Sequence, residues 1–330
     1  MQRYLVICLA AALVAACAQV NQQPSNGKLN VVTTVSPITN IIYNIGGQRI
    51  NLTGIIPEGT DSHTFEPAPS SAQLFAGADI IFVNGLHLED PTVNLAEANL
   101  RSGAQIVKLG EATLTTDQYI YDFSFPKSAG NPNPHLWMNP MNGLKYAQIV
   151  RDTLSKRDPA NAAYYNKNFD AFQARITALD KAIMQSVDSI PENNRKLLTY
   201  HDSFAYFAPR YHMTVIGAIQ PADFAEPSPK EIADLITQIK REHVPAIFGS
   251  EVFPSPILAQ IAKETGAKYE DSLRDDDLPG VVGDANHSYL GLIVTDVQTI
   301  TKDLGGNPAP LDHFDMSNVP GADSDVKQTQ

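Results

Sequence analysis

The hydrophobic positions along the chain alternate between short apolar runs and longer stretches with helical spacing. In the first half, the short runs lie at 29–35, 50–56, 79–83 and 105–109. Ser36-Pro37 and Gly46-Gly47 bracket a helix after the first run, because proline favours a helix start and glycine a helix end. Residues 70–76 predict a second helix. This alternation of strands and helices predicts a mainly parallel sheet.

The longest helical pattern begins at Asp158 and ends near Ile190, after a helix expected at about 140–156. Its apolar residues recur every three or four positions, at Tyr165, Phe169, Phe172, Ile176, Leu179, Ile183 and Val187. Such spacing indicates one buried helical face. At 1.5 Å per residue the helix is about 40 Å long, which is enough to span two lobes.

Strands and helices alternate again beyond this helix. Short runs at 196–200, 214–219, 246–248 and 267–269 predict strands, and helices are expected at 231–242, from Ser255-Pro256 to Gly266, and at 289–304. The predicted fold class is α/β, with two lobes that have mainly parallel central sheets and are joined by a single long rigid helix. We place the N-terminal lobe at 29–157, the connecting helix at 158–191 and the C-terminal lobe at 192–304. Residues 305–330 are rich in Gly, Pro, Asp and Ser and predict a disordered tail.

The first residues have the pattern of an export signal. A basic start at Arg3 precedes an apolar run at 4–16, which is too short to span a bilayer, and Cys17 follows directly. Val14-Ala15-Ala16-Cys17 resembles the bacterial lipobox, in which the cysteine is lipidated; ordinary cleavage with an incidental Cys17 is the alternative. We therefore expect a signal peptide at 1–17, a flexible tether at 18–28, and an exported periplasmic or cell-surface protein anchored to the membrane through lipid on Cys17.

Composition narrows the possible chemistry. The chain has 330 residues, 43% of them hydrophobic, and a net charge of −12, which argues against nucleic acid as a partner. Cys8 lies in the signal, so only Cys17 remains and the mature protein has no internal disulfide. A metal site would therefore need His, Asp and Glu side chains.

Four candidate ligands lie where strands end or helices begin. His63 follows the run at 50–56, and His135 precedes the helix near Pro140. His201 follows the run at 196–200, and Asp271 ends the strand that contains Tyr269. Open α/β sheets bind ligands at the carboxyl ends of their strands. The spacings form no local metal motif, so each residue taken alone is also compatible with an ordinary polar loop.

An ordered set of motifs resembles the bacterial solute-binding lipoproteins of zinc and manganese ABC transporters. The match runs from about 29 to 304. Its motifs are His63-Thr64-Phe65-Glu66-Pro67, Asn84-Gly85-Leu86-His87-Leu88-Glu89, Pro134-His135-Leu136-Trp137, Asp158-Pro159, Thr199-Tyr200-His201-Asp202-Ser203-Phe204, Glu226-Pro227-Ser228-Pro229 and Asp271-Ser272-Leu273.

The resemblance implies a metal site in the cleft between the lobes, with His63, His135, His201 and Asp271 as ligands. It also implies an ABC transporter permease as partner and a role in capture and delivery, not enzymatic catalysis. The acidic run Asp275–Asp277 could compete with Asp271, although a solvated loop is the expected role of this run. Glu66, Asp202 and backbone carbonyl groups are candidates to orient the metal-binding histidines. We expect a monomer whose lobes move little when metal binds.

The ligand types favour Zn²⁺ as the transported ion. Three imidazoles and one carboxylate suit tetrahedral Zn²⁺, whereas Mn²⁺ prefers more oxygen donors. A manganese receptor of the same family remains the alternative, because the stretch 113–134 contains no histidine that could collect zinc. Further alternatives are a binding protein for a siderophore or corrinoid and an exported zinc hydrolase. An additional adhesin role is compatible with any of these.

Overall fold

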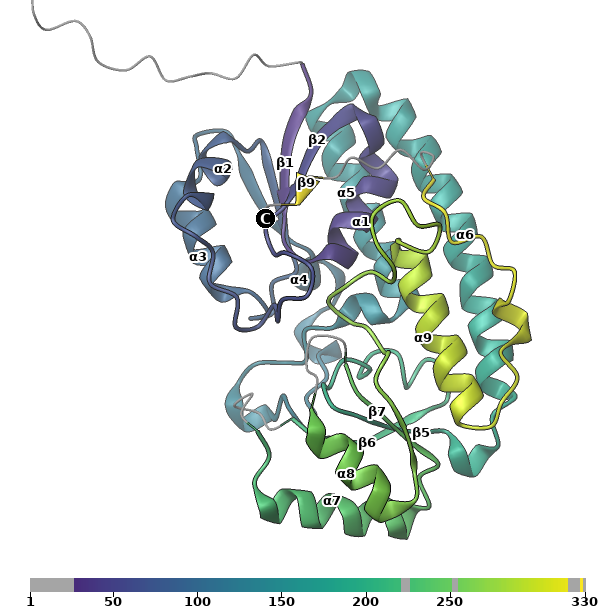
Figure 1. Ribbon diagram of the computed structural model, residues 1–330. Helices are drawn as coiled ribbons and strands as arrows, with labels where there is room; N and C mark the ends of the chain where they lie inside the picture. Colours follow the sequence, from purple (N-terminus) through teal and green to yellow (C-terminus); the bar gives the residue numbers. More distant parts are fainter. Residues whose placement is uncertain (1–26, 221–225, 251–254, 320–326, 329–330) are drawn as a thin grey trace, which may run out of the picture.

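Two parallel sheets form the centres of two lobes in the computed structural model (Figure 1). The structure describes residues 27–220, 226–250, 255–319 and 327–328. The expected signal peptide, Cys17 and nearly all of the tether lie outside these residues.

The N-terminal sheet has the strand order β4-β3-β1-β2-β9, with every neighbouring pair parallel. Its strands are β1 (Leu29–Thr33), β2 (Ile50–Gly54), β3 (Ile80–Val83), β4 (Gln105–Lys108) and β9 (Lys327–Gln328). Val31 of β1 lies opposite Leu52 of β2 and Ile80 of β3. All four residues of β3 are buried, as expected for a strand with both faces covered.

Five α-helices in the described part of the chain follow or connect the strands of this sheet. They are α1 (Ser36–Gly46), α2 (Ser71–Gly77), α3 (Asp90–Asn99), α4 (Leu109–Thr113) and α5 (Pro140–Arg157). The side chain of Asn139 accepts a hydrogen bond from the backbone N–H of Met141, and Pro140 occupies the first turn, so the start of α5 is capped. The sequence interpretation did not include α3, although Asp90-Pro91 is a typical helix start.

The C-terminal sheet has the order β6-β5-β7-β8 and is also parallel. Its strands are β5 (Lys196–Thr199), β6 (Thr214–Ala218), β7 (Ala246–Phe248) and β8 (Lys268–Glu270). The helices of this lobe are α7 (Pro229–Glu242) and α8 (Pro256–Thr265). Ser228 and Glu231 form the capping box that starts α7.

The helix α6 (Ala162–Asp188) runs along one side of the molecule from one lobe to the other (Figure 1). All seven apolar residues that predicted its buried face are buried. It packs against α1, α5 and α9 (Tyr289–Asp303). The predicted α/β fold with two lobes and one long linking helix is confirmed.

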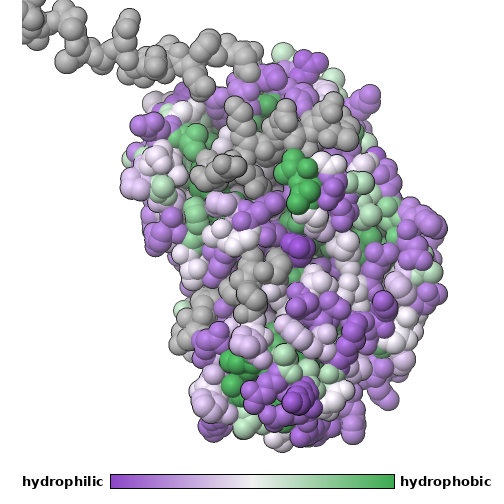
Figure 2. All heavy atoms as spheres, in the orientation of Figure 1, coloured by the Kyte–Doolittle hydropathy of each residue, from purple (hydrophilic) through white to green (hydrophobic). Residues whose placement is uncertain are grey.

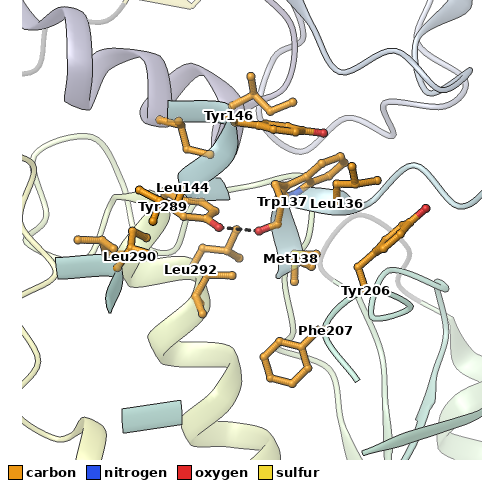
Figure 3. Packing of buried hydrophobic residues seen from close by; sticks show 14 of the residues in the cluster. Leu136, Trp137, Met138, Leu144, Tyr146, Tyr206, Phe207, Tyr289, Leu290 and Leu292 are labelled. Carbon is orange, nitrogen blue, oxygen red and sulfur yellow. Dashed lines mark hydrogen bonds between the residues drawn. The ribbon is translucent and has the colours of Figure 1, made fainter. Parts of the chain in front are cut away.

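A buried aromatic cluster holds the segment after His135 against α9. Figure 3 shows Trp137 beside Leu136, Tyr146 and Tyr289, and the Tyr289 hydroxyl donates a hydrogen bond to the Trp137 carbonyl oxygen at 2.6 Å. Trp137 itself is completely buried. This packing fixes the chain just beyond the second predicted ligand.

The prediction of a disordered tail from residue 305 is wrong for residues 305–319. Leu311 is buried, and Phe314, Met316 and Val319 pack against the main core. Arg175 of α6 forms a 3.0 Å ion pair with Asp315, and the Asn44 side chain accepts a hydrogen bond from the Val319 N–H. These apolar residues are too widely and irregularly spaced to show a periodic pattern, yet each one reaches the core separately.

The surface in Figure 2 is largely hydrophilic, with small separate hydrophobic patches. Among the described residues, the exposed large hydrophobic side chains are Leu100, Phe123, Val281 and Val282. None of the described helices is both long enough and apolar enough to cross a membrane.

Candidate metal centre

Three histidines from distant parts of the chain meet between the lobes. His63 lies in the loop between β2 and α2, His135 just before α5, and His201 two residues after the end of β5. The Nε2 atom of His63 lies 3.3 Å from that of His135 and 3.3 Å from that of His201. The Nε2 atoms of His135 and His201 are 2.9 Å apart. Within the described residues, this is the one group of His, Cys, Asp and Glu side chains close enough together to hold a metal.

Hydrogen bonds on the far side of two rings define which nitrogen faces the group. The Nδ1–H of His135 donates to Asn133 Oδ1 at 2.9 Å, and the Nδ1–H of His201 donates to Gln220 Oε1 at 2.7 Å. In the neutral rings, Nε2 therefore carries a lone pair and no proton. Two lone pairs that face each other this closely repel unless a cation lies between them.

The separations match those of ligands around a single ion. Nitrogen ligands about 2.0–2.1 Å from a tetrahedral Zn²⁺ lie about 3.3 Å from one another. The three measured Nε2 separations, 3.3, 3.3 and 2.9 Å, are close to that value. The three Nε2 atoms thus lie at separations suited to three of the four corners of a tetrahedral site.

Burial favours the neutral form of two of the three rings. Burial lowers the pKa of His63 well below its usual value, and the charge of His201 lowers it further. Burial likewise lowers the pKa of His135, with smaller contributions from His201 and His63. The Phe125 ring lies over the group, with its centroid 5.6 Å from the His63 ring and 5.7 Å from the His135 ring. The lowered pKa values of His63 and His135 favour the neutral form of these two rings, which metal binding requires.

The structure brings together the three predicted histidines but not the predicted carboxylate. The Asp271 side chain is exposed and lies outside the histidine group. Asp275 is nearer, with its Oδ2 atom 3.9 Å from His201 Nε2, and this residue is only 2% exposed. A small cavity beside His201 is lined by Ser203, Ser250 and Asp275, among others.

The expectation that Asp275–Asp277 form a solvated loop is wrong, because all three residues are buried. They are the acceptors for donors from the other lobe: Trp137 Nε1–H donates to the Asp275 carbonyl, and the Ser62 and Gly59 N–H groups donate to Asp276 and Asp277. Burial, followed by the charge of Asp275, raises the pKa of Asp276 well above its usual value. Burial raises the pKa of Asp277 to about 6.

Two amides that the sequence interpretation missed orient the rings. Asn133 and Gln220 take the role that had been considered for Glu66 and Asp202. Glu66 is exposed, while Asp202 acts one step away, since its carbonyl oxygen accepts from Asn133 Nδ2 at 2.6 Å. Gln220 lies just beyond the end of β6, and this position at the carboxyl end of a strand was the available sequence signal.

The family profile of the zinc-uptake complex component A, periplasmic (ZnuA), matches residues 31–303. The chain belongs to this family. Members of the ZnuA family are metal-binding receptors of ABC transporters that work with permease and ATPase components, and they are not enzymes.

Relatives of this ZnuA-family chain carry names with different metals. The iron-binding protein YfeA of Yersinia pestis is 31% identical over 88% of this chain and 91% of its own length. The manganese ABC transporter lipoprotein scaA of Streptococcus gordonii is 29% identical over 92% of this chain and 98% of its own. The periplasmic zinc-binding protein TroA of Treponema pallidum superposes with a TM-score of 0.76 at 25% identity, covering 84% of this chain and 99% of its own. The family therefore establishes binding of a divalent metal, and the choice of metal depends on the site itself.

Proposed function

We propose that this protein captures one divalent transition metal ion, with Zn²⁺ preferred, and delivers it to the permease of an ABC importer. The observation that carries the proposal is the pair of Nε2 lone pairs of His135 and His201, held 2.9 Å apart by amides behind each ring. A bound cation turns this repulsion into two coordinate bonds. His63 supplies the third.

A carboxylate from the segment after β8 completes the site. Asp271 is the ligand that the family resemblance implies, and Asp275 is the one that lies nearest in this structure. Either residue gives three imidazoles and one carboxylate. This set suits four-coordinate Zn²⁺ better than Mn²⁺, which favours more oxygen ligands. If the carboxylate binds through both oxygens the coordination number rises, and this favours the manganese alternative.

Export and anchoring complete the proposal. The apolar run at 4–16 and Cys17 support a lipid-anchored protein on the outer side of a membrane, and relatives are named lipoproteins. The protein is proposed to act as a monomer toward its permease, with no nucleic acid partner.

Metal content measured by mass spectrometry tests the proposal. Protein that lacks residues 1–17 is stripped, reloaded from an equimolar mixture of Zn²⁺ and Mn²⁺, and compared with His201→Ala. One Zn²⁺ per chain in the wild type and a strongly reduced content in the variant support a zinc receptor. One Mn²⁺ per chain keeps the transport role but overturns the choice of metal, and no stoichiometric metal overturns the proposal.

The variants Asp271→Asn and Asp275→Asn identify the carboxylate ligand. Loss of a ligand should weaken Zn²⁺ binding at least about tenfold, whereas the other variant should change it little. A competition titration against a chelator of known affinity measures both. If neither variant weakens binding, the fourth ligand is not a carboxylate of this segment.

A further inference from the structure

One segment of the chain contacts the loops of all three histidines. This crossing segment, residues 274–288, leads from β8 to α9 and contains the three consecutive residues Asp275, Asp276 and Asp277. The side chain of Asp275 approaches His201, while its carbonyl oxygen accepts from Trp137, two residues after His135. Asp276 and Asp277 accept hydrogen bonds from the loop that carries His63.

The His63 loop, residues 55–63, depends on the crossing segment for hydrogen-bond partners. The Gly59 N–H donates to Asp277 Oδ2 at 2.6 Å, and the Ser62 N–H donates to Asp276 Oδ2 at 3.0 Å. Glu58 Oε1 also lies 3.4 Å from His287 Nε2, without a hydrogen bond between them. Gly59 has a φ of +76°, which favours glycine, so the turn that presents its N–H is specified by the sequence.

These bonds hold a loop that carries one of the proposed ligands. His63 is the least buried of the three histidines, and its Nε2 closes the site at 3.3 Å from each of the other two. Its position relative to His201 therefore depends on how firmly its loop is held against the other lobe. Each bond joins a backbone N–H of the loop to a buried carboxyl group, which is costly to leave without a partner.

We infer that Asp276 and Asp277 are positioning residues that hold the His63 loop against the crossing segment and thereby set how long the metal stays bound. Release to the permease then requires these hydrogen bonds to break, so that His63 leaves the other two histidines. The inference rests on the proposed function, and it adds a pair of residues that do not touch the ion.

The rate of metal release tests the inference. Full-length mature chain is loaded with one equivalent of Zn²⁺ and mixed with excess chromogenic chelator in a stopped-flow instrument. Asp276→Ala and Asp277→Ala should each release Zn²⁺ about tenfold faster than wild type, since each lacks one interlobe acceptor. Asp276→Asn and Asp277→Asn should restore much of the slow release, because an amide oxygen still accepts the N–H.

Asp284→Ala is the matched control. Asp284 lies in the same crossing segment, but its carboxylate accepts from Val281 N–H within that segment. Its release rate should stay within about twofold of wild type, as for a loop residue without contact to the ligand loop. Equal melting temperatures of the metal-free variants would separate positioning from a general loss of stability.

The outcomes distinguish the inference from the proposed function. Stoichiometric Zn²⁺ with the same release rate in wild type and all variants overturns the positioning role and leaves the metal receptor intact. Absence of stoichiometric metal in wild type overturns both. If the alanine variants do not fold, amide hydrogen exchange in the wild type decides: the Gly59 and Ser62 amides should be protected in the Zn²⁺-loaded chain, and exchange as fast as in an unbonded loop contradicts the inference.

Discussion

Asn133 Oδ1 accepts two hydrogen bonds from His135, one from the backbone N–H at 3.0 Å and one from the ring Nδ1–H at 2.9 Å. The other end of the same amide is also engaged, because Nδ2 donates to Asp122 Oδ2 at 3.0 Å and to the Asp202 carbonyl at 2.6 Å. The amide therefore cannot turn over without losing bonds at both ends. A single side chain fixes both the loop conformation and the tautomer of one of the three clustered histidines.

Asn133→Ala should lower Zn²⁺ affinity about 10- to 100-fold, the usual effect of removing a residue that orients a ligand. Without the acceptor, the ring can rotate or bind a proton on Nε2, where the metal should bind. A chelator competition titration measures the change. Asn131→Ala is the control, since Asn131 lies in the same loop but is exposed. Equal affinities of both variants would show that the amide does not prepare the ring.

Glu89 should make the stability of the metal-free protein depend on pH. Its carboxyl group is buried and accepts from Thr34 Oγ1 and from the Asn84 and Gly85 N–H groups, and burial raises its pKa from 4.5 to about 7. Between these two values, the folded state keeps a proton that the unfolded state has lost. The contribution of Glu89 is therefore fully present below pH 4.5 and is lost as pH rises through 7.

Glu89→Gln removes this titration. The free energy of unfolding, measured in urea at pH 5 and pH 8, should fall by up to about 3 kcal/mol more in wild type than in the variant. A variant that loses as much stability as wild type over this range would show that Glu89 titrates normally.

Leu311→Ala should destabilise the protein by about 2–4 kcal/mol, since a buried leucine is replaced and a cavity remains. Urea unfolding measures the difference. His313→Ala, two residues further along and exposed, should change stability by no more than about 0.5 kcal/mol. If both variants match wild type, residues 305–319 do not contribute to the folded core in solution.

Metal binding should change the radius of gyration very little. The lobes are linked by α6, by α9 packed along it, and by hydrogen bonds between the crossing segment and the loops of the histidines. Such a frame permits local loop movement more readily than wide closure of a cleft. Small-angle scattering of metal-free and Zn²⁺-loaded protein tests this, and a large decrease on loading would contradict it.

The sequence by itself determined most of the elements of the fold. Runs of β-branched residues, helix caps and the three-and-four spacing after Asp158 depend on neighbours in the chain, so β1, α1 and α6 could be predicted from local pattern alone. The positions of His63 and His201 just beyond strands followed from the same pattern, because parallel strands end at one edge of their sheet. Only the resemblance to a family, however, joined the histidines into one site.

The tertiary structure alone decided how that site is built. Asn133 and Gln220 orient the rings, Asp275 lies next to His201, and Asp276 and Asp277 hold the His63 loop. Most of these contacts join residues that are far apart in the sequence, and no local periodicity records them. From the sequence alone, Asp275–Asp277 are expected to be exposed to solvent, because a carboxyl group is buried only where hydrogen-bond donors meet it. In the folded chain those donors come from the opposite lobe.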